Sequence, residues 1–192
     1  MRISDAEILI IPGWSSSGED HWQSRWERGM KTARRVEQEE WFKPDKDAWV
    51  HNILLAIAEA SRPPVLVAHS LGVAAVAHAA RSIPKNLVAA AFLVAPADVD
   101  HGADWPITQG HAFESTGTGF TPMPILPLPF PATLVASSND PYCSLERARY
   151  LATEWGAKFV EAGEVGHINT ASGHGPWPEG LLHFGGLLGT IP

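Results

Sequence analysis

The chain alternates between short, continuous runs of apolar residues and longer segments in which apolar residues recur at helical spacing. Short apolar runs bounded by glycine, proline or polar residues are typical of strands buried on both faces of a sheet. Such runs predict strands at residues 8–12, 65–69, 88–94 and 133–137. Weaker patterns, an alternation of acidic residues typical of a sheet edge and a short run late in the chain, predict strands at 36–41 and 158–161.

The segments between these runs have the apolar spacing of amphipathic helices. In residues 19–33, Trp22, Trp26 and Met30 recur every four positions and predict one buried stripe. Similar patterns predict helices at 44–60, 72–80, 145–155 and 177–188. Strands that alternate with helices imply right-handed crossovers, and therefore a doubly wound, mostly parallel six-stranded sheet with helices on both faces. The sequence predicts an α/β fold in one domain over residues 1–192.

Composition and charge exclude several classes of protein. With 45% hydrophobic and 18% charged residues, the chain is typical of a folded globular protein. The formal net charge is −7 and the basic residues are scattered, so we expect no nucleic-acid partner. The first residues lack the basic start and apolar run of a signal peptide, and no apolar segment approaches membrane-spanning length. We therefore expect a cytoplasmic protein that does not associate with membranes.

One predicted strand ends abruptly at a serine and is followed at once by a helix of small residues, in Ala68-His69-Ser70-Leu71-Gly72. A serine on such a turn has its hydroxyl exposed at the end of the sheet, which is the geometry of the nucleophile elbow G-x-S-x-G. Ala68 replaces the first glycine, and alanine is the smallest substitute at a crowded position. The same turn also fits a serine that only caps a helix, so the nucleophile hypothesis needs a base and an acid elsewhere.

Both partners occur downstream at the ends of predicted strands. Asp140 follows the strand at 133–137, and His167 follows the strand at 158–161 within a glycine-containing loop. The carboxyl ends of parallel strands meet at one edge of a sheet, where ligands bind. An aspartate there can orient a histidine, and the histidine can deprotonate a serine. The order Ser70, Asp140, His167 is the one expected of an α/β-hydrolase.

Other residues could fill some of these roles. Asp98 and Asp100 follow the preceding strand and could supply the acid, while His174 could replace the base. His69 is expected to point away from the serine hydroxyl and to pack or hydrogen-bond locally. Cys143, the single cysteine, lacks a strand-turn-helix frame and is expected to be a small buried side chain rather than a nucleophile. The remaining histidines show no metal-ligand spacing, so we expect no metal.

An acyl-transfer site also needs donors for the developing oxyanion and a place for the substrate. The backbone N–H of Leu71, at the start of the elbow helix, and that of Trp14, in the loop after the first strand, are the predicted donors. Trp14 and Trp105 are candidates for the wall of an apolar acyl pocket. The long segment 98–131, rich in proline, could form a pocket wall or a small lid, or could be a connector that follows the surface.

Several motifs together resemble one family, the small serine hydrolases related to retinoblastoma-binding protein nine. The resemblance extends over nearly the whole chain, through Pro-Gly-Trp at 12–14, His-Trp at 21–22, the elbow at 68–72, Ser-Ser-Asn-Asp-Pro-Tyr at 137–142, Gly-His-Ile-Asn at 166–169 and Ser-Gly-His-Gly-Pro-Trp-Pro-Glu-Gly at 172–180. It implies a compact α/β-hydrolase fold without a large cap domain, and a triad of Ser70, Asp140 and His167. The Leu-x-Cys-x-Glu motif associated with retinoblastoma-protein binding is absent from this sequence, so that role does not transfer.

These observations together predict a serine hydrolase that cleaves a carboxylic ester, a thioester or an amide of a small acyl substrate through an acyl-enzyme on Ser70. This chemistry requires no metal and no cofactor. An alternative is a non-catalytic protein-interaction module that has kept the scaffold. Another alternative keeps the fold but changes the reaction, as in an acyltransferase or a cofactor-free lyase.

Overall fold

A computed structural model describes residues 1–114 and 117–191, with only the backbone described for residues 103 and 104. Its centre is a six-stranded sheet in the order β2-β1-β3-β4-β5-β6, in which every neighbouring pair of strands is parallel. The strands are β1 (Ile8–Ile11), β2 (Ala33–Arg35), β3 (Val65–Ser70), β4 (Ala90–Pro96), β5 (Ala132–Ala136) and β6 (Lys158–Glu161). The predicted six-stranded α/β architecture is confirmed, and the sheet is entirely rather than mostly parallel.

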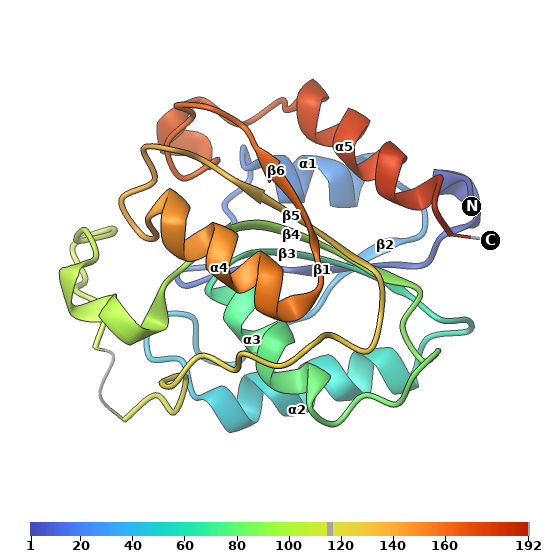
Figure 1. The fold of residues 1–192 in the computed structure, drawn as a ribbon, viewed down its shortest axis with the longest axis horizontal. Helices are drawn as coiled ribbons and strands as arrows, with labels where there is room; N and C mark the ends of the chain where they lie inside the picture. Colours follow the sequence, from blue (N-terminus) through green and yellow to red (C-terminus); the bar gives the residue numbers. More distant parts are fainter. Residues whose placement is uncertain (115–116, 192) are drawn as a thin grey trace.

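Helices cover both faces of this sheet (Figure 1). The α-helices are α1 (Trp22–Gly29), α2 (Lys46–Ala58), α3 (Leu71–Ala80), α4 (Leu145–Trp155) and α5 (Pro178–Leu188), with short 3-10 helices η1 (Ile3–Asp5), η2 (Val99–Asp104) and η3 (Thr170–Ser172). Helices α1 and α5 pack on one face, and α2, α3 and α4 pack on the other. In the described part of the chain, no helix combines the length and apolar character needed to cross a bilayer.

The continuous apolar runs are explained by this layering. Side chains that follow one another in a strand point to opposite faces of the sheet. In β1, Leu9 and Ile11 therefore pack in the cluster with α2, α3 and α4, while Ile8 and Ile10 pack with α1 and α5. All four side chains are buried. A strand that supplies two cores has no polar face, which is why the sequence shows a run rather than an alternation.

Helix α1 is shorter than the predicted span 19–33. It begins after His21, whose ring Nδ1 accepts a hydrogen bond from the amide of Gln23 at 3.1 Å and caps the helix. It ends before Met30, which has extended backbone, and the chain enters β2 three residues later. The periodic spacing of apolar residues thus continues past the residues that are helical.

The prediction of a strand at 36–41 is wrong, because β2 ends at Arg35. The amide of Val36 still donates to β1, at 2.8 Å, but the chain leaves the sheet after this bond. Trp41 packs edge-on against Trp49 of α2, with ring centroids 5.5 Å apart. Packing of this partly buried aromatic side chain against α2 accompanies the departure from the sheet edge, and the alternation of residues alone did not reveal it.

The long segment 98–131 combines two of the predicted roles. Residues 117–131 form a connector that packs on the protein, because Phe120, Met123 and Phe130 are buried in the cluster formed by α2, α3 and α4. Residues 105–109 line the cavity beside Ser70 and therefore form a pocket wall.

Candidate active site

Ser70 occupies the sharp turn between β3 and α3. Its backbone has φ +56° and ψ −124°, a conformation that non-glycine residues rarely adopt and that costs on the order of 1–3 kcal/mol. Ser70 is the N-cap residue of α3, yet its side chain makes no capping hydrogen bond. Its Oγ lies instead 2.8 Å from the Nε2 atom of His167. The interpretation of Ser70 as an ordinary capping serine is therefore wrong.

The small residues around the serine are required by close backbone contacts. A Cβ atom on Gly72 would lie 2.5 Å from the carbonyl oxygens of both Ile11 and Pro12 at the end of β1. A Cβ atom on Gly13 would lie 2.6 Å from the Cβ of Ser70. Real Cβ atoms are not found at such distances, so both positions need glycine unless the backbone moves. The loop after β1 is thereby packed directly on the elbow.

This contact brings together the two segments that carry the predicted oxyanion donors. The Cβ position of Gly13 is 3.0 Å from the amide nitrogen of Leu71, the first residue of α3, and Trp14 follows Gly13 in the chain. The first amides of a helix have no intrahelical acceptor, and the helix dipole favours negative charge there. The amide of Leu71 is therefore available to a ligand at the end of β3.

Asp140 and His167 meet Ser70 in one chain of hydrogen bonds. The Nδ1 atom of His167 lies 2.9 Å from each carboxylate oxygen of Asp140, and its Nε2 lies 2.8 Å from Ser70 Oγ. Nδ1–H donates to the carboxylate, which leaves the Nε2 lone pair directed at the hydroxyl. The imidazole side chain of His167 is 7% exposed and the carboxylate side chain of Asp140 is 2% exposed, so both lie away from bulk water. The structure thus brings the three predicted side chains together.

The alternatives to Asp140 and His167 lie elsewhere. Asp98 and Asp100 both accept hydrogen bonds from the guanidinium of Arg147 on α4. His174 contacts a neighbouring serine hydroxyl, at 3.1 Å, rather than the elbow. Cys143 is buried, and burial raises the pKa of its thiol, which keeps it protonated and unreactive. The Asp98, Asp100 and His174 hypotheses are not supported by this geometry, and Cys143 is the buried side chain that was expected.

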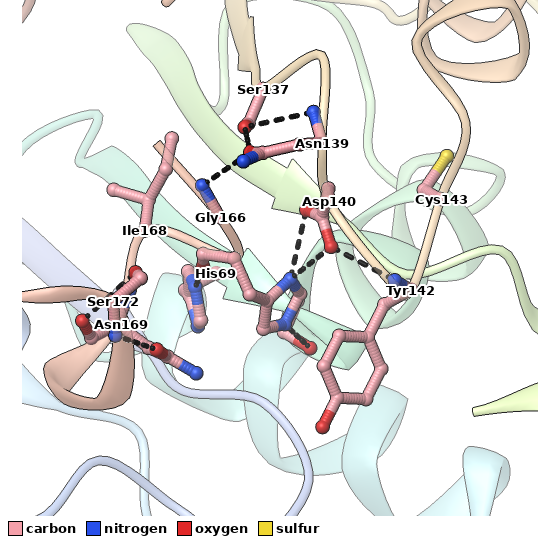
Figure 2. A network of polar contacts seen from close by, with 12 residues as sticks. His69, Ser137, Asn139, Asp140, Tyr142, Cys143, Gly166, Ile168, Asn169 and Ser172 are labelled. Carbon is pink, nitrogen blue, oxygen red and sulfur yellow. Dashed lines mark hydrogen bonds and ion pairs between the residues drawn. The ribbon is translucent and has the colours of Figure 1, made fainter. Parts of the chain in front are cut away.

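Sequence patterns did not reveal how the loops that carry Asp140 and His167 are held together. Asn139 Oδ1 accepts hydrogen bonds from the Gly166 amide at 2.6 Å and from the Ser137 hydroxyl at 2.8 Å. Figure 2 shows that these bonds connect Asn139, the residue before Asp140, to Gly166, the residue before His167. The network fixes the separation of the two loops and hence the Asp140–imidazole contact. The only sequence signal for it was the Ser-Ser-Asn-Asp motif itself.

Two ring N–H groups hydrogen-bond the backbone of the loop that carries His167. His69 Nε2 lies 2.8 Å from the carbonyl oxygen of His167, and Trp22 Nε1 donates to the carbonyl of Ile168 at 2.9 Å. Burial lowers the pKa of His69 well below its ordinary value, so the ring is neutral and Nε2–H is the donor to this carbonyl. The prediction that His69 packs and hydrogen-bonds instead of contacting the serine hydroxyl is confirmed. The sequence did not show that the acceptor of this bond is the main-chain carbonyl of His167.

A cavity of about 630 Å³ opens above Ser70. Trp14 and Trp105 line it, as predicted from sequence, together with Tyr142. The Tyr142 ring lies over the imidazole of His167, with centroids 4.1 Å apart, and its hydroxyl hydrogen-bonds the Thr108 hydroxyl at 2.8 Å. A cavity of this size is typical of sites for small molecules.

His21 makes the unfolding free energy of the protein depend on pH. Burial lowers the pKa of His21 to about 3, while the unfolded value stays near 6.5. Between these values the unfolded chain binds the proton and the folded chain does not, so stability is lost as the pH falls below about 6.5. We expect His21 alone to cost about 2 kcal/mol of unfolding free energy between about pH 7 and pH 5.

The measurement is chemical denaturation of the wild type and of His21→Asn at both pH values. Asparagine keeps a side-chain acceptor at the N-cap of α1 but does not titrate. The variant should therefore lose about 2 kcal/mol less than the wild type on acidification. An identical loss in both proteins would contradict a neutral, buried His21.

Comparisons with known proteins identify the family of this chain. A family model described as serine hydrolase matches residues 8–185. A protein described as a YdeN-like hydrolase from Pectobacterium atrosepticum is 33% identical, with 99% of this chain and 95% of that chain covered and a TM-score of 0.82. No curated protein matches the sequence significantly.

More distant structures share the fold. The ydeN gene product of Bacillus subtilis is 19% identical, with 96% of this chain and 100% of that chain covered and a TM-score of 0.74. The esterase domain of a Rhodothermus marinus protein is 17% identical, with 95% and 87% covered and a TM-score of 0.68. The fold is thus the compact α/β-hydrolase fold. Because the family model spans nearly the whole chain, and a relative is one-third identical along its length, this protein belongs to the serine hydrolase family.

Proposed function

We propose that this chain is an esterase-like serine hydrolase in which Ser70, His167 and Asp140 form the catalytic triad. One observation carries the proposal: the His167 imidazole lies between the Ser70 hydroxyl, at 2.8 Å, and both Asp140 oxygens, at 2.9 Å. This is the arrangement that makes a serine nucleophilic. Family membership supports hydrolysis, and the esterase domain among the similar structures favours an ester.

The mechanism follows from the placement of these groups. Ser70 Oγ attacks the carbonyl carbon of the substrate while its proton passes to His167 Nε2, and the carboxylate of Asp140 stabilises the resulting imidazolium. The amides of Leu71 and Trp14 donate to the oxyanion of the tetrahedral intermediate. His167 then gives the proton to the leaving alcohol as the C–O bond breaks, which leaves an acyl group on Ser70. Water attacks this ester with His167 again as base, and the carboxylic acid departs.

A fluorophosphonate probe separates this proposal from a non-catalytic scaffold. The probe phosphonylates only serines that are activated by a base, so we expect time-dependent labelling of the native protein and none after denaturation. The labelled protein should also lose hydrolysis of p-nitrophenyl butyrate in proportion to the label. A native protein that neither labels nor hydrolyses the ester would be an interaction module on a hydrolase scaffold.

A further inference from the structure

The cavity above Ser70 is uncharged on every side that the structure describes. Its lining comes from loops at the carboxyl ends of the strands, and no described lining residue is Asp, Glu, Lys or Arg. The polar groups on the wall are hydroxyls, amides and imidazoles. A charged substrate group held inside the cavity would therefore lose water without meeting a counter-charge, which is costly.

The histidines on this wall do not supply the missing charge. Burial lowers the pKa of His21 to about 3 and that of His69 well below its ordinary value, so both rings are neutral at physiological pH. Their ring centroids are 4.9 Å apart, and that of His69 is 4.8 Å from that of His167. Two cations at these distances would repel one another, which adds to burial in keeping the rings of His21 and His69 neutral.

The ionic groups behind the wall disfavour anions further. The carboxylate of Asp140 is buried and hydrogen-bonded to the base. Two cations lie near the wall, and both are paired with carboxylates. Arg147 is paired with Asp98 and Asp100. Arg35, which donates to the hydroxyl of the lining residue Ser16, is paired with Glu27 at 3.0 Å. Both guanidinium groups are thus ion-paired, while the buried carboxylate of Asp140 has the His167 imidazole as its partner. A carboxylate on the substrate would add a second negative charge near that of Asp140. The two charges would repel one another in a site of low dielectric constant.

The cavity also has an apolar side that suits an acyl chain. Trp105 contacts Tyr142, with ring centroids 5.7 Å apart, and Ile107 follows two residues later on the same wall. The side chain of Ile107 is 72% exposed, so it presents apolar surface without being part of the core. Another part of the lining is polar and uncharged, with His21 and the hydroxyl- and amide-bearing loop 169–172. One end of the substrate can thus be hydrocarbon and the other neutral and polar.

We propose that the site takes uncharged esters with an apolar acyl chain along the Trp105–Ile107 wall, and that it rejects esters with a carboxylate in that chain. This inference rests on the proposed hydrolase function and adds the substrate class. The discrimination arises from the absence of a counter-charge, not from size.

The test compares two substrates that differ in one charge, p-nitrophenyl hydrogen glutarate and p-nitrophenyl methyl glutarate, in which a methyl ester masks the carboxylate. With spontaneous hydrolysis subtracted, we expect kcat/KM for the neutral ester to exceed that for the acid by about 100-fold or more. Equal values, or a preference for the acid, would overturn the proposal. Turnover of p-nitrophenyl butyrate in the same series reports on the hydrolase function itself, so the two failures are distinguishable.

A charge placed on the proposed wall should change this preference. Ile107→Lys puts an ammonium group beside the acyl chain at an exposed position, so folding should be unaffected, and it should reduce the preference for the neutral ester about tenfold. The matched control is Ile125→Lys, at an exposed isoleucine that does not line the cavity. It should leave the ratio unchanged. An unchanged ratio in Ile107→Lys would contradict the placement of the acyl chain along this wall.

Discussion

Replacement of Ser70 by alanine is expected to reduce kcat/KM for p-nitrophenyl butyrate on the order of 10⁴-fold or more, with folding intact. The substitution removes the oxygen on which the proposed acyl-enzyme would form, while the proposed oxyanion donors and the cavity remain. Alanine is smaller than serine and adds no atom to the site. Helix α3 also loses no capping bond, because the serine hydroxyl makes none. The measurement is initial-rate kinetics, with circular dichroism and thermal unfolding as checks of the fold.

The matched control for this experiment is Cys143→Ala. Cys143 is the single cysteine and lies three residues after Asp140, yet it is buried with a raised thiol pKa. We expect this variant to retain the activity of the wild type within a small factor. Substantial ester hydrolysis by Ser70→Ala, or loss of hydrolysis in folded Cys143→Ala, would mean that the nucleophile has been assigned to the wrong residue.

Asp140→Asn is expected to reduce kcat by roughly 10³- to 10⁴-fold. Asparagine has nearly the same shape but presents an NH₂ group as well as an oxygen to His167 Nδ1, and it carries no charge. The imidazole then loses the partner that keeps its proton on Nδ1 and that stabilises the imidazolium in the transition state. KM should change much less than kcat, since Asp140 lies behind the imidazole, where it cannot touch the substrate.

The control for Asp140→Asn is Asp100→Asn, which tests the alternative acid on the same edge of the sheet. Asp100 hydrogen-bonds Arg147 and the Met123 amide, and has no contact with the imidazole. We expect Asp100→Asn to keep near-normal kcat with a modest loss of stability. Similar large losses in both variants, with both proteins folded, would argue that the site's acid is not Asp140.

The strands buried on both faces were the most predictable part of the fold. A run such as Val65-Leu66-Val67 must be continuous, because alternate side chains enter different cores. The edge strand β2 and the ends of α1 were not predictable in this way. They depend on the His21 cap, which is a local side-chain hydrogen bond, and on the packing of Trp41 against α2, which is a tertiary contact. Neither leaves a periodic signal in the sequence.

The candidate site also has residues that the sequence could predict and contacts that it could not. Ser70, Asp140 and His167 could be found from sequence because each follows a strand, and the ends of parallel strands meet at one edge. The groups that hold them could not. The bond from His69 to the carbonyl of His167 and the ring of Tyr142 over the imidazole depend on how loops distant in sequence face one another after folding.

Peptide mapping of the fluorophosphonate adduct tests the central claim most directly, because it identifies the atom on which the chemistry occurs. In the wild type, the adduct should be found on the peptide that contains Ser70, and His167→Ala should show little or no labelling, since the hydroxyl would lose its base. An adduct on any other residue, or undiminished labelling of Ser70 in His167→Ala, would contradict a serine activated by this histidine.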